Sequence, residues 1–580
     1  MRDDSLRIDR FFTRRMFVRQ YIPALISMVV LSFGDIADSL VLGHRIGYVG
    51  LAALALTMPV AQVFNAIMNA LGIGGSIRFA SRMARGQREE AAAGFQGVVC
   101  AAGAAGLGIA LAGNLLLAPL LDLLGAPASE AGIHAAAGEY LRILLWGAPV
   151  LFLNYVLNYF LKTDDLEKEA GIAFTAGNIL DIGLNIVLVL VLRMGVTGAG
   201  LATVAGQALS LTLSAAAIRR RGSALKLRGM KPDLEEAWKS FRVGLSSSVE
   251  FLYSMVFLLI ANHLLIGTLG GAGAAMLDVV LGASYFMMNL YDAVVKSILP
   301  VVSTYSGERN AAGMRLALKT GLRYTLCSGA ALGILVFAFP EAICRFFGMD
   351  DPALTALGRN ALRLYALSIP PAGIGILMAN YWEARQMERR ALAVSTLRGG
   401  LPILLALLLA SFRPEGFWSL YLLSELLTLA GIAVLFRPRR SSGENERRVF
   451  RSTILSVDTE ISRTVERIEE FCERWNATPS QQYMAMMSVE EICVATLNSG
   501  FQGKADGYIQ IVLIALEEGG FELHIRDNAA SFNPLALEMK ENPDAEGANL
   551  DALGIVAIRR KTKSFSYRHF QGFNTVIIRI

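Results

Sequence analysis

Charged residues are scarce in this sequence. Lys, Arg, Asp and Glu make up 18% of the 580 residues, whereas soluble globular chains carry roughly 25%. Hydrophobic residues make up 54%, and they are concentrated before about position 436, while charges are more frequent after it. The shortage of charge excludes an ordinary soluble chain for the first part. The sequence therefore divides into a long apolar part and a shorter polar part.

A large net charge and paired cysteines are also missing. The formal net charge is +5, and Lys and Arg are spread over short loops, which gives no support for nucleic-acid binding. The cysteines show neither paired nor metal-ligand spacing, so we expect no metal site and no disulfide scaffold. We interpret them as reduced packing residues: Cys100, Cys327, Cys344, Cys472 and Cys493.

Long apolar runs fill the first 436 residues. A helix that crosses the hydrocarbon core of a bilayer needs ~20 mainly apolar residues, because its backbone polar groups must be satisfied within the segment. The sequence predicts an all-α polytopic membrane protein with twelve transmembrane helices in two six-helix bundles. We expect these helices near 20–43, 49–72, 95–118, 138–161, 170–192, 197–218, 243–268, 272–302, 318–339, 357–382, 391–411 and 417–436.

The loops between these runs alternate in positive charge. Lys and Arg are frequent in every second connection and scarce in the others, and such a bias places the basic loops in the cytoplasm. The first run is too long for the apolar core of a signal peptide, so we expect it to remain as a helix. We therefore expect a multi-pass protein of the bacterial cytoplasmic (inner) membrane, surrounded by lipid, with both termini in the cytoplasm.

The apolar part contains an internal repeat. Residues 141–149 match residues 362–370, and residues 158–160 match residues 380–382. Six helices separate the copies, so both have the same orientation and a pseudo-twofold axis should run along the membrane normal. We expect substrate to bind between the two bundles. The predicted segments are an N-terminal segment 1–19, bundles 20–220 and 243–436 joined by a loop 221–242, a linker 437–449 and a cytoplasmic domain 450–580.

Three motifs of the apolar part resemble a known family. Residues 22–27 read Ile-Pro-Ala-Leu-Ile-Ser, residues 38–43 read Asp-Ser-Leu-Val-Leu-Gly, and residues 195–203 read Gly-Val-Thr-Gly-Ala-Gly-Leu-Ala-Thr. Their order and the repeat resemble the multidrug and toxic-compound extrusion (MATE) family over roughly residues 15–436. The resemblance implies an antiporter that exports small organic cations in exchange for H⁺ or Na⁺ and needs no other cofactor.

Several carboxylates lie inside the apolar runs. A charged side chain at the bilayer centre costs ~3 kcal/mol or more, so such residues are functional candidates by default. Burial raises the pKa of a carboxyl and a nearby cation lowers it, so a buried Asp can exchange a proton for a cation near neutral pH. Our candidates for the ion-coupling and substrate cavity are Asp35, Asp38, Asp181, Asn185, Glu250 and Asp292.

The MATE resemblance implies roles for some of these candidates. It assigns cation coupling to the first-helix Asp, which Asp38 matches, together with an Asn-x-x-x-Asp pair on the fifth helix. Asp181 and Asn185 form that pair in reversed order, still on one helical face. Asp35 is explained equally well by a functional role and by a structural one, in which it lies beside Asp38 or hydrogen-bonds a neighbouring helix. Glu250 lies about one turn before the position of a coupling Glu in another branch.

The remaining candidate, Asp292, has a structural explanation at least as good as a functional one. It lies four residues before Lys296, which predicts an ion pair within one helix. Lys296 is also the only strong cation that we find within the apolar runs. Aromatic and Met side chains would suit lipophilic organic cations, but they are equally typical of packing or lipid contact: Tyr285, Met287, Met288, Tyr291 and Trp382.

The polar part has the pattern of a small α/β sandwich domain. It predicts strands near 450–456, 508–516, 520–527, 564–570 and 573–580, and helices near 458–475, 479–499 and 549–562. This order resembles the ATP-binding fold of histidine kinases and anti-sigma-factor kinases. The motifs that carry the resemblance are at 488–495, 526–534 and 549–556.

The nucleotide-binding motifs of this fold are eroded. Ala495 stands where the family has the Asn that holds Mg²⁺, and Ala529 stands where a Gly follows the adenine-contacting Asp. Gly allows the backbone to approach phosphate closely. We therefore expect a degenerate, regulatory domain that contacts a cytoplasmic regulatory protein, and no active kinase; ATP binding is disfavoured. The residues to which the resemblance would assign nucleotide contacts are Glu490, Glu491, Asn498, Asp527 and Gly554.

Three functions are compatible with these patterns. The first is a secondary antiporter for organic cations. The second is a flippase for lipid-linked precursors of the related superfamily, whose cavities tend to be basic. The third is a membrane sensor that signals through the C-terminal domain.

Overall fold

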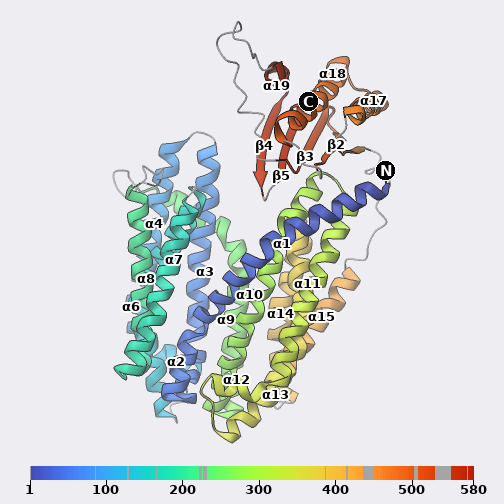
Figure 1. The fold of residues 1–580 in the computed structure, drawn as a ribbon. Helices are drawn as coiled ribbons and strands as arrows, with labels where there is room; N and C mark the ends of the chain where they lie inside the picture. The colour runs from blue at the N-terminus through green and yellow to red at the C-terminus, as the bar shows by residue number, and fades with distance from the viewer. Residues whose placement is uncertain are drawn as a thin grey trace.

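The computed structural model describes most of the chain. The described residues are 2–84, 87–126, 130–164, 166–220, 225, 232–385, 387–412, 416–435, 448–455, 458–501, 507–529, 550–570 and 573–580. A long helical bundle carries a small α/β domain (residues 448–580, the C-terminal domain) against one of its ends (Figure 1).

Long apolar helices build the bundle, as predicted. Among the described residues, eleven helices are long and apolar enough to cross a membrane, and α15 is a shorter apolar helix. Each of the twelve predicted runs overlaps one of these helices. The helices of the bundle are α1 (Arg2–Asp35), α2 (Ala37–Ile46), α3 (Tyr48–Ala84), α4 (Arg88–Leu115), α5 (Leu117–Leu124), α6 (Ala131–Thr163), α7 (Glu167–Asn185), α8 (Gly195–Arg220), α9 (Leu234–Leu269), α10 (Gly271–Gly307), α11 (Ala311–Ala338), α12 (Pro340–Phe346), α13 (Pro352–Ala384), α14 (Glu388–Phe412) and α15 (Ser419–Leu435).

The internal repeat is visible in the helix lengths. α3 and α10 both have 37 residues, α4 and α11 both have 28, and α6 and α13 both have 33. A short helix, α5 or α12, follows α4 or α11 in each half. The two halves are thus structural repeats with the same order of helices, in agreement with the repeat in the sequence.

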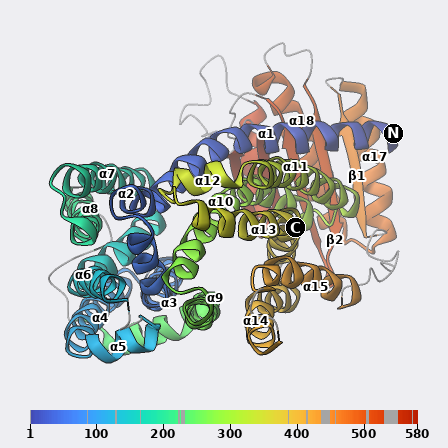
Figure 2. The same cartoon turned by 90° about the horizontal axis from the view of Figure 1, so that it is seen from below.

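The first helix of each half packs against the other half. α1 contacts α10 and α11, whereas α9 contacts α3 and α4, and Figure 2 shows α1 running along α10 and α11. The α3–α9 contact depends on glycine, because a Cβ on Gly74 would lie 1.9 Å from the carbonyl oxygen of Ser240 and a Cβ on Gly244 would lie 2.0 Å from that of Ala70. The halves of the sequence therefore interlock in space.

The first predicted span is broken. α1 ends at Asp35, and the chain resumes a helix at Ala37 after Ile36, whose φ of −107° and ψ of 2° are not helical. α2 then packs against α3, α7 and α8. The break matters because it directs α1 to the C-terminal half and leaves α2, with Asp38 in its first turn, in the N-terminal half.

The C-terminal domain has the predicted order of elements. Five antiparallel strands form a sheet of order β1-β2-β3-β5-β4. Apolar side chains of one sheet face form a core with the helices. The elements are β1 (Val449–Ile454), α17 (Asp458–Arg474), α18 (Pro479–Ala495), β2 (Ile509–Ala515), β3 (Phe521–Asp527), α19 (Leu550–Lys561), β4 (Ser564–Phe570) and β5 (Phe573–Arg579).

Candidate functional site

Asp38 lies at the centre of a hydrogen-bonded cluster between four helices. Its Oδ2 accepts from the hydroxyl of Tyr140 at 2.9 Å and from Thr203 Oγ1 at 3.2 Å, and its Oδ1 accepts from Asn185 Nδ2 at 2.6 Å. These residues come from α2, α6, α7 and α8. Asp38 also occupies the first turn of α2, where the free backbone N–H groups favour a negative charge.

Asn185 joins Asp38 to a second carboxylate. Its Nδ2 donates to Asp181 Oδ1 at 3.0 Å, one turn earlier on α7. The side chain is fully buried, and its Oδ1 has no hydrogen-bond partner among the described residues. A π-helical segment, Ile186–Val191, begins at the next residue, and such segments often occur at functional sites. The structure thus brings together three of the six candidates.

A third carboxylate lies near this cluster. Asp278 on α10 is 1% exposed, Ser39 contacts its carboxylate, and it is within electrostatic range of Asp38. Its Oδ2 has no hydrogen-bond partner among the described residues. Sequence reasoning did not select Asp278, Tyr140 or Thr203 as site residues. Two of them had a signal in the sequence: Asp278 is a carboxylate within the predicted run 272–302, and Thr203 is the last residue of the motif at 195–203.

The other membrane candidates do not join the cluster. Glu250 is exposed on α9. Asp292 forms an ion pair with Lys296 at 3.3 Å, and both side chains are about half exposed, which agrees with the structural explanation. Asp35 is the last residue of α1, but its side chain lies outside the described residues.

The expectation that Lys296 is the only strong cation within the spans is wrong. Arg398 on α14 forms an ion pair with Glu425 on α15 at 3.1 Å, and the two side chains are 20% and 15% exposed. Both residues lie within predicted runs, 391–411 and 417–436, but their pairing across two helices is not visible in the sequence. Two of the predicted substrate contacts are packing residues, since Trp382 is buried and the buried Tyr291 donates its hydroxyl to the carbonyl of Ile369 at 2.6 Å.

In the C-terminal domain, Asp527 is committed to local hydrogen bonds. Its Oδ1 accepts from the backbone N–H of Ala529 at 2.9 Å and from Asn574 Nδ2 at 2.7 Å. Burial raises the pKa of the nearby Cys493 thiol, and the charge of Asp527 adds to the rise, so this thiol stays protonated and unreactive. Residues 530–549, with the second part of the motif at 526–534 and the first residue of the motif at 549–556, lie outside the described residues.

The remaining nucleotide candidates are dispersed. Glu490 and Asn498 are exposed, and Asn498 lies in a π-helical segment, Thr496–Gly500, beyond α18. Gly554 on α19 packs directly against Glu491, because a Cβ at residue 554 would lie 2.2 Å from the Glu491 carboxylate. A carboxylate therefore lies against the glycine that the resemblance assigns to phosphate approach. Ala495 is fully buried at the end of α18.

The second face of the sheet packs on the bundle. Alternate residues of a strand point to opposite faces. On β3, Leu523 and Ile525 join the core beneath the helices, whereas Arg526 points to the bundle. On β5, Phe573 packs edge-on against Phe12 of α1, with ring centroids 4.9 Å apart. The sheet therefore lies between the helices of its own domain and the ends of α1 and α10.

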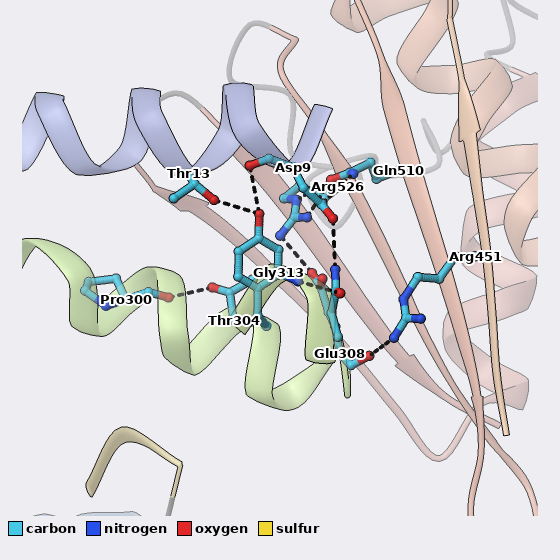
Figure 3. Close-up of polar contacts among 11 residues, drawn as sticks. Asp9, Thr13, Pro300, Thr304, Glu308, Gly313, Arg451, Gln510 and Arg526 are labelled. Carbon is cyan, nitrogen blue, oxygen red and sulfur yellow. Dashed lines mark hydrogen bonds and ion pairs between the residues drawn. The ribbon is translucent and has the colours of Figure 1, made fainter. Parts of the chain in front are cut away.

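Arg526 is the central contact of this interface (Figure 3). Its Nη1 lies 2.8 Å from Glu308 Oε1 just beyond α10, and these side chains are only 3% and 2% exposed. Its guanidinium lies 3.8 Å from the ring centroid of Phe12 and its Nε donates to Gln510 at 3.1 Å. Arg451 donates to the backbone carbonyl of Glu308 at 3.3 Å. Sequence reasoning missed the ion pair of Arg526 with Glu308, although Arg526 lies in the motif at 526–534.

Asp9 connects α1 to the same interface. Its Oδ1 accepts from Gln510 Nε2 at 3.2 Å and its Oδ2 accepts from Asn310 Nδ2 at 3.2 Å. Its backbone carbonyl accepts from the hydroxyl of Tyr305 at 3.1 Å, and this hydroxyl is also 3.0 Å from Thr13 Oγ1. The C-terminal domain, α1 and α10 therefore share one buried polar network.

Two family profiles match this chain. The MatE profile matches residues 23–187 and 243–408, one segment in each repeat. The profile of the histidine kinase-like ATPase domain matches residues 456–580.

Relatives of the bundle are named multidrug resistance or multidrug export proteins. A probable multidrug resistance protein NorM of Thermotoga maritima is 24% identical over 371 residues, which cover 61% of this chain and 76% of the relative. The multidrug export protein MepA of Staphylococcus saprophyticus is 22% identical over 450 residues, which cover 75% of this chain and 96% of the relative.

Solved structures share the fold of the bundle. One is described as the inward-facing conformation of a multidrug resistance MATE family transporter of the MOP superfamily, with a TM-score of 0.62, 19% identity and coverage of 72% of this chain and 99% of that chain. An outward-facing conformation gives a TM-score of 0.56 at 22% identity, over 72% of this chain and 93% of that chain. Because the MatE match spans more than half of the sequence, the chain belongs to the MatE family of multidrug efflux transporters, and it carries a histidine kinase-like ATPase domain behind its membrane bundle.

Proposed function

We propose that this protein is a secondary antiporter that exports small organic cations across the bacterial cytoplasmic membrane in exchange for H⁺ or Na⁺. The observation that carries the proposal is the pair of carboxylates, Asp38 and Asp181, joined through the amide of Asn185. Two carboxylates in a water-poor environment disfavour each other's charge. A bound proton or a hard cation relieves this repulsion.

The free oxygen of Asn185 supports a cation-binding role. Buried acceptors are nearly always satisfied by a donor, water or an ion. Both carboxylates and the amide oxygen offer oxygen atoms, which hard cations prefer. A protonated carboxyl would satisfy a neighbouring acceptor equally well, so this geometry is compatible with either coupling ion.

The paired cations favour an antiporter over a flippase for lipid-linked precursors. Lys296 lies beside Asp292, and Arg398 lies beside Glu425. Each positive charge is therefore offset by a carboxylate, and neither supplies the free basic surface that an anionic lipid carrier would need. The names of the relatives, multidrug export and multidrug resistance proteins, support the same choice.

Transport by the purified full-length protein in proteoliposomes tests this function. We expect ethidium, a lipophilic cation, to be transported against its gradient when a pH or Na⁺ gradient is imposed, with no ATP present. Collapse of the imposed gradient with an ionophore should stop transport. The proposal fails if neither gradient drives ethidium, or if transport requires ATP. Separate pH and Na⁺ arms identify the coupling ion.

The C-terminal domain acts in this proposal as a regulatory clamp on the cytoplasmic side. It holds Asp9 and Phe12 of α1 and Glu308 beyond α10 in one buried network. α1 runs without interruption from this network to Asp35, only three residues before Asp38. Docking of the domain therefore restrains the helix that leads to the coupling site. A cytoplasmic regulatory protein would act by changing this docking.

We expect no tight ATP binding by the C-terminal domain. Ala495 supplies no Mg²⁺ ligand, Asp527 is hydrogen-bonded to Asn574, and Glu491 lies against Gly554. Isothermal titration of the full-length protein with ATP and Mg²⁺ should give a Kd no tighter than about 1 mM, which is about −4 kcal/mol. Micromolar, Mg²⁺-dependent binding that Asp527→Asn weakens would show that the nucleotide site is intact.

A further inference from the structure

A basic cleft lies between α1 and α11, beside the domain interface. Its volume is about 750 Å³. Four of its lining residues are Arg10 and Arg14 on α1, and Lys319 and Arg323 on α11. Each pair is spaced four residues apart, so its members lie on one face of their helix. Two rows of positive charge therefore border the same cleft.

The part of the chain that the structure describes does not neutralise these four charges. None of them makes an ion pair or hydrogen bond with another described residue through its charged group, and all four are exposed. No carboxylate lines the cleft among the described residues. The nearest acidic residue along α1 is Asp9, and its carboxylate oxygens accept hydrogen bonds from Asn310 and Gln510. Like charges gathered in one concavity attract an anion that would offset their mutual repulsion.

The cleft lies at the level expected for lipid headgroups. It is at the end of α11 that carries the basic residues, and the helix continues from Arg323 to Ala338 as an apolar segment. The outer surface of that segment is exposed at Leu326 and Ile334, as expected for lipid contact. The cleft also includes the exposed Cys327, so it is continuous with this apolar surface. An acidic phospholipid could place its headgroup in the cleft and its acyl chains along α11.

We propose that this cleft binds a phosphate-bearing anion, the headgroup of an acidic phospholipid of the cytoplasmic leaflet. Basic pockets between transmembrane helices on that side are a recurrent way to bind such headgroups. Three of the four basic residues, Arg10, Arg14 and Arg323, carry guanidinium groups, which are suited to bidentate contact with phosphate oxygens. The segment of α1 that borders the cleft also carries Asp9 and Phe12, which contact the C-terminal domain.

Native mass spectrometry of the detergent-solubilised full-length protein tests the proposal. The protein is titrated with phosphatidylglycerol, with phosphatidylcholine as the zwitterionic control, and with inorganic phosphate. Three forms are compared: the wild type, Arg14→Gln/Arg323→Gln, and the matched control Arg88→Gln/Arg389→Gln, which removes two exposed charges from the starts of α4 and α14. The single variant Lys319→Gln is measured as well, in case the double variant unfolds.

We expect the wild type and the control to bind one phosphatidylglycerol about tenfold more tightly than phosphatidylcholine, and the double cleft variant to lose this preference. Lys319→Gln should lose about threefold, and added salt should weaken binding to the wild type. If inorganic phosphate binds at the cleft and phosphatidylglycerol does not, the site is a free-phosphate site. Equal lipid binding by all variants, or equal binding of the two lipids by the wild type, overturns the proposal. This readout does not depend on transport, so it can fail while the antiporter proposal stands.

Discussion

Replacement of Asp38 by Asn should abolish ion-coupled export while the protein remains folded. Asn keeps the shape of the side chain and an oxygen that can accept from Tyr140 and Thr203, but it can neither release a proton nor offer a negative charge to Na⁺. Coupling free energies between two ligands are typically 1–3 kcal/mol, or 5- to 150-fold in affinity. We expect gradient-driven ethidium transport to fall by roughly 100-fold, at the upper end of that range. Asp181→Asn should also lower gradient-driven ethidium transport.

The measurement is the initial rate of ethidium transport in proteoliposomes under the coupling gradient. Asp122→Asn, at an exposed position on α5, removes a carboxylate elsewhere and serves as the matched control, with an expected rate close to that of the wild type. Thermal unfolding of each variant shows whether the bundle is intact. If Asp38→Asn and Asp181→Asn are both folded and both transport normally, coupling does not occur at this cluster.

Replacement of Arg526 by Met should release the C-terminal domain from the bundle. The change leaves Glu308 buried without its positive partner, and breaking a buried pair in this way costs about 3–5 kcal/mol. The contact with the ring of Phe12 loses its charge as well. Removal of both charges in Arg526→Met/Glu308→Gln should recover a large part of the loss, because no uncompensated charge then remains.

Hydrogen–deuterium exchange checks this prediction. We expect exchange of residues 9–16 and 508–514 to rise at least 100-fold in Arg526→Met, as 3 kcal/mol corresponds to more than two factors of ten. Arg579→Met is the matched control, since Arg579 is exposed and its ion pair with the exposed Glu518 is a 4.0 Å contact, and such surface pairs contribute about 0–1 kcal/mol. If docking restrains α1, the released variant should also transport ethidium faster. Unchanged exchange at residues 9–16 would show that Arg526 does not hold the domain.

The sequence by itself determined the helical bundle, the repeat and the order of elements in the C-terminal domain. Transmembrane runs are set by length and apolarity, which are local properties. The strands and helices after residue 448 follow from alternation and periodicity, which are equally local. The i,i+4 pairs Asp181–Asn185 and Asp292–Lys296 were predictable for the same reason, since spacing along one helix fixes which residues face each other.

Only the tertiary structure decided which distant residues meet. Tyr140 and Thr203 contact Asp38 from α6 and α8. They are 102 and 165 residues away from Asp38 along the chain, and no spacing rule connects such distant positions. The break at Ile36 sends α1 across to the other half of the bundle, which an uninterrupted apolar run did not predict.

The role of the C-terminal domain changed most. Its sequence shows an eroded nucleotide-binding fold, but not the surface on which it docks. A strand exposes alternate residues on two faces, so Asp527 and Arg526 point in opposite directions. Sequence reasoning considered only the first of these, and the structure shows the second paired with Glu308 and buried. Burial of that pair needs a partner surface from the bundle, and only packing of the complete chain supplies it.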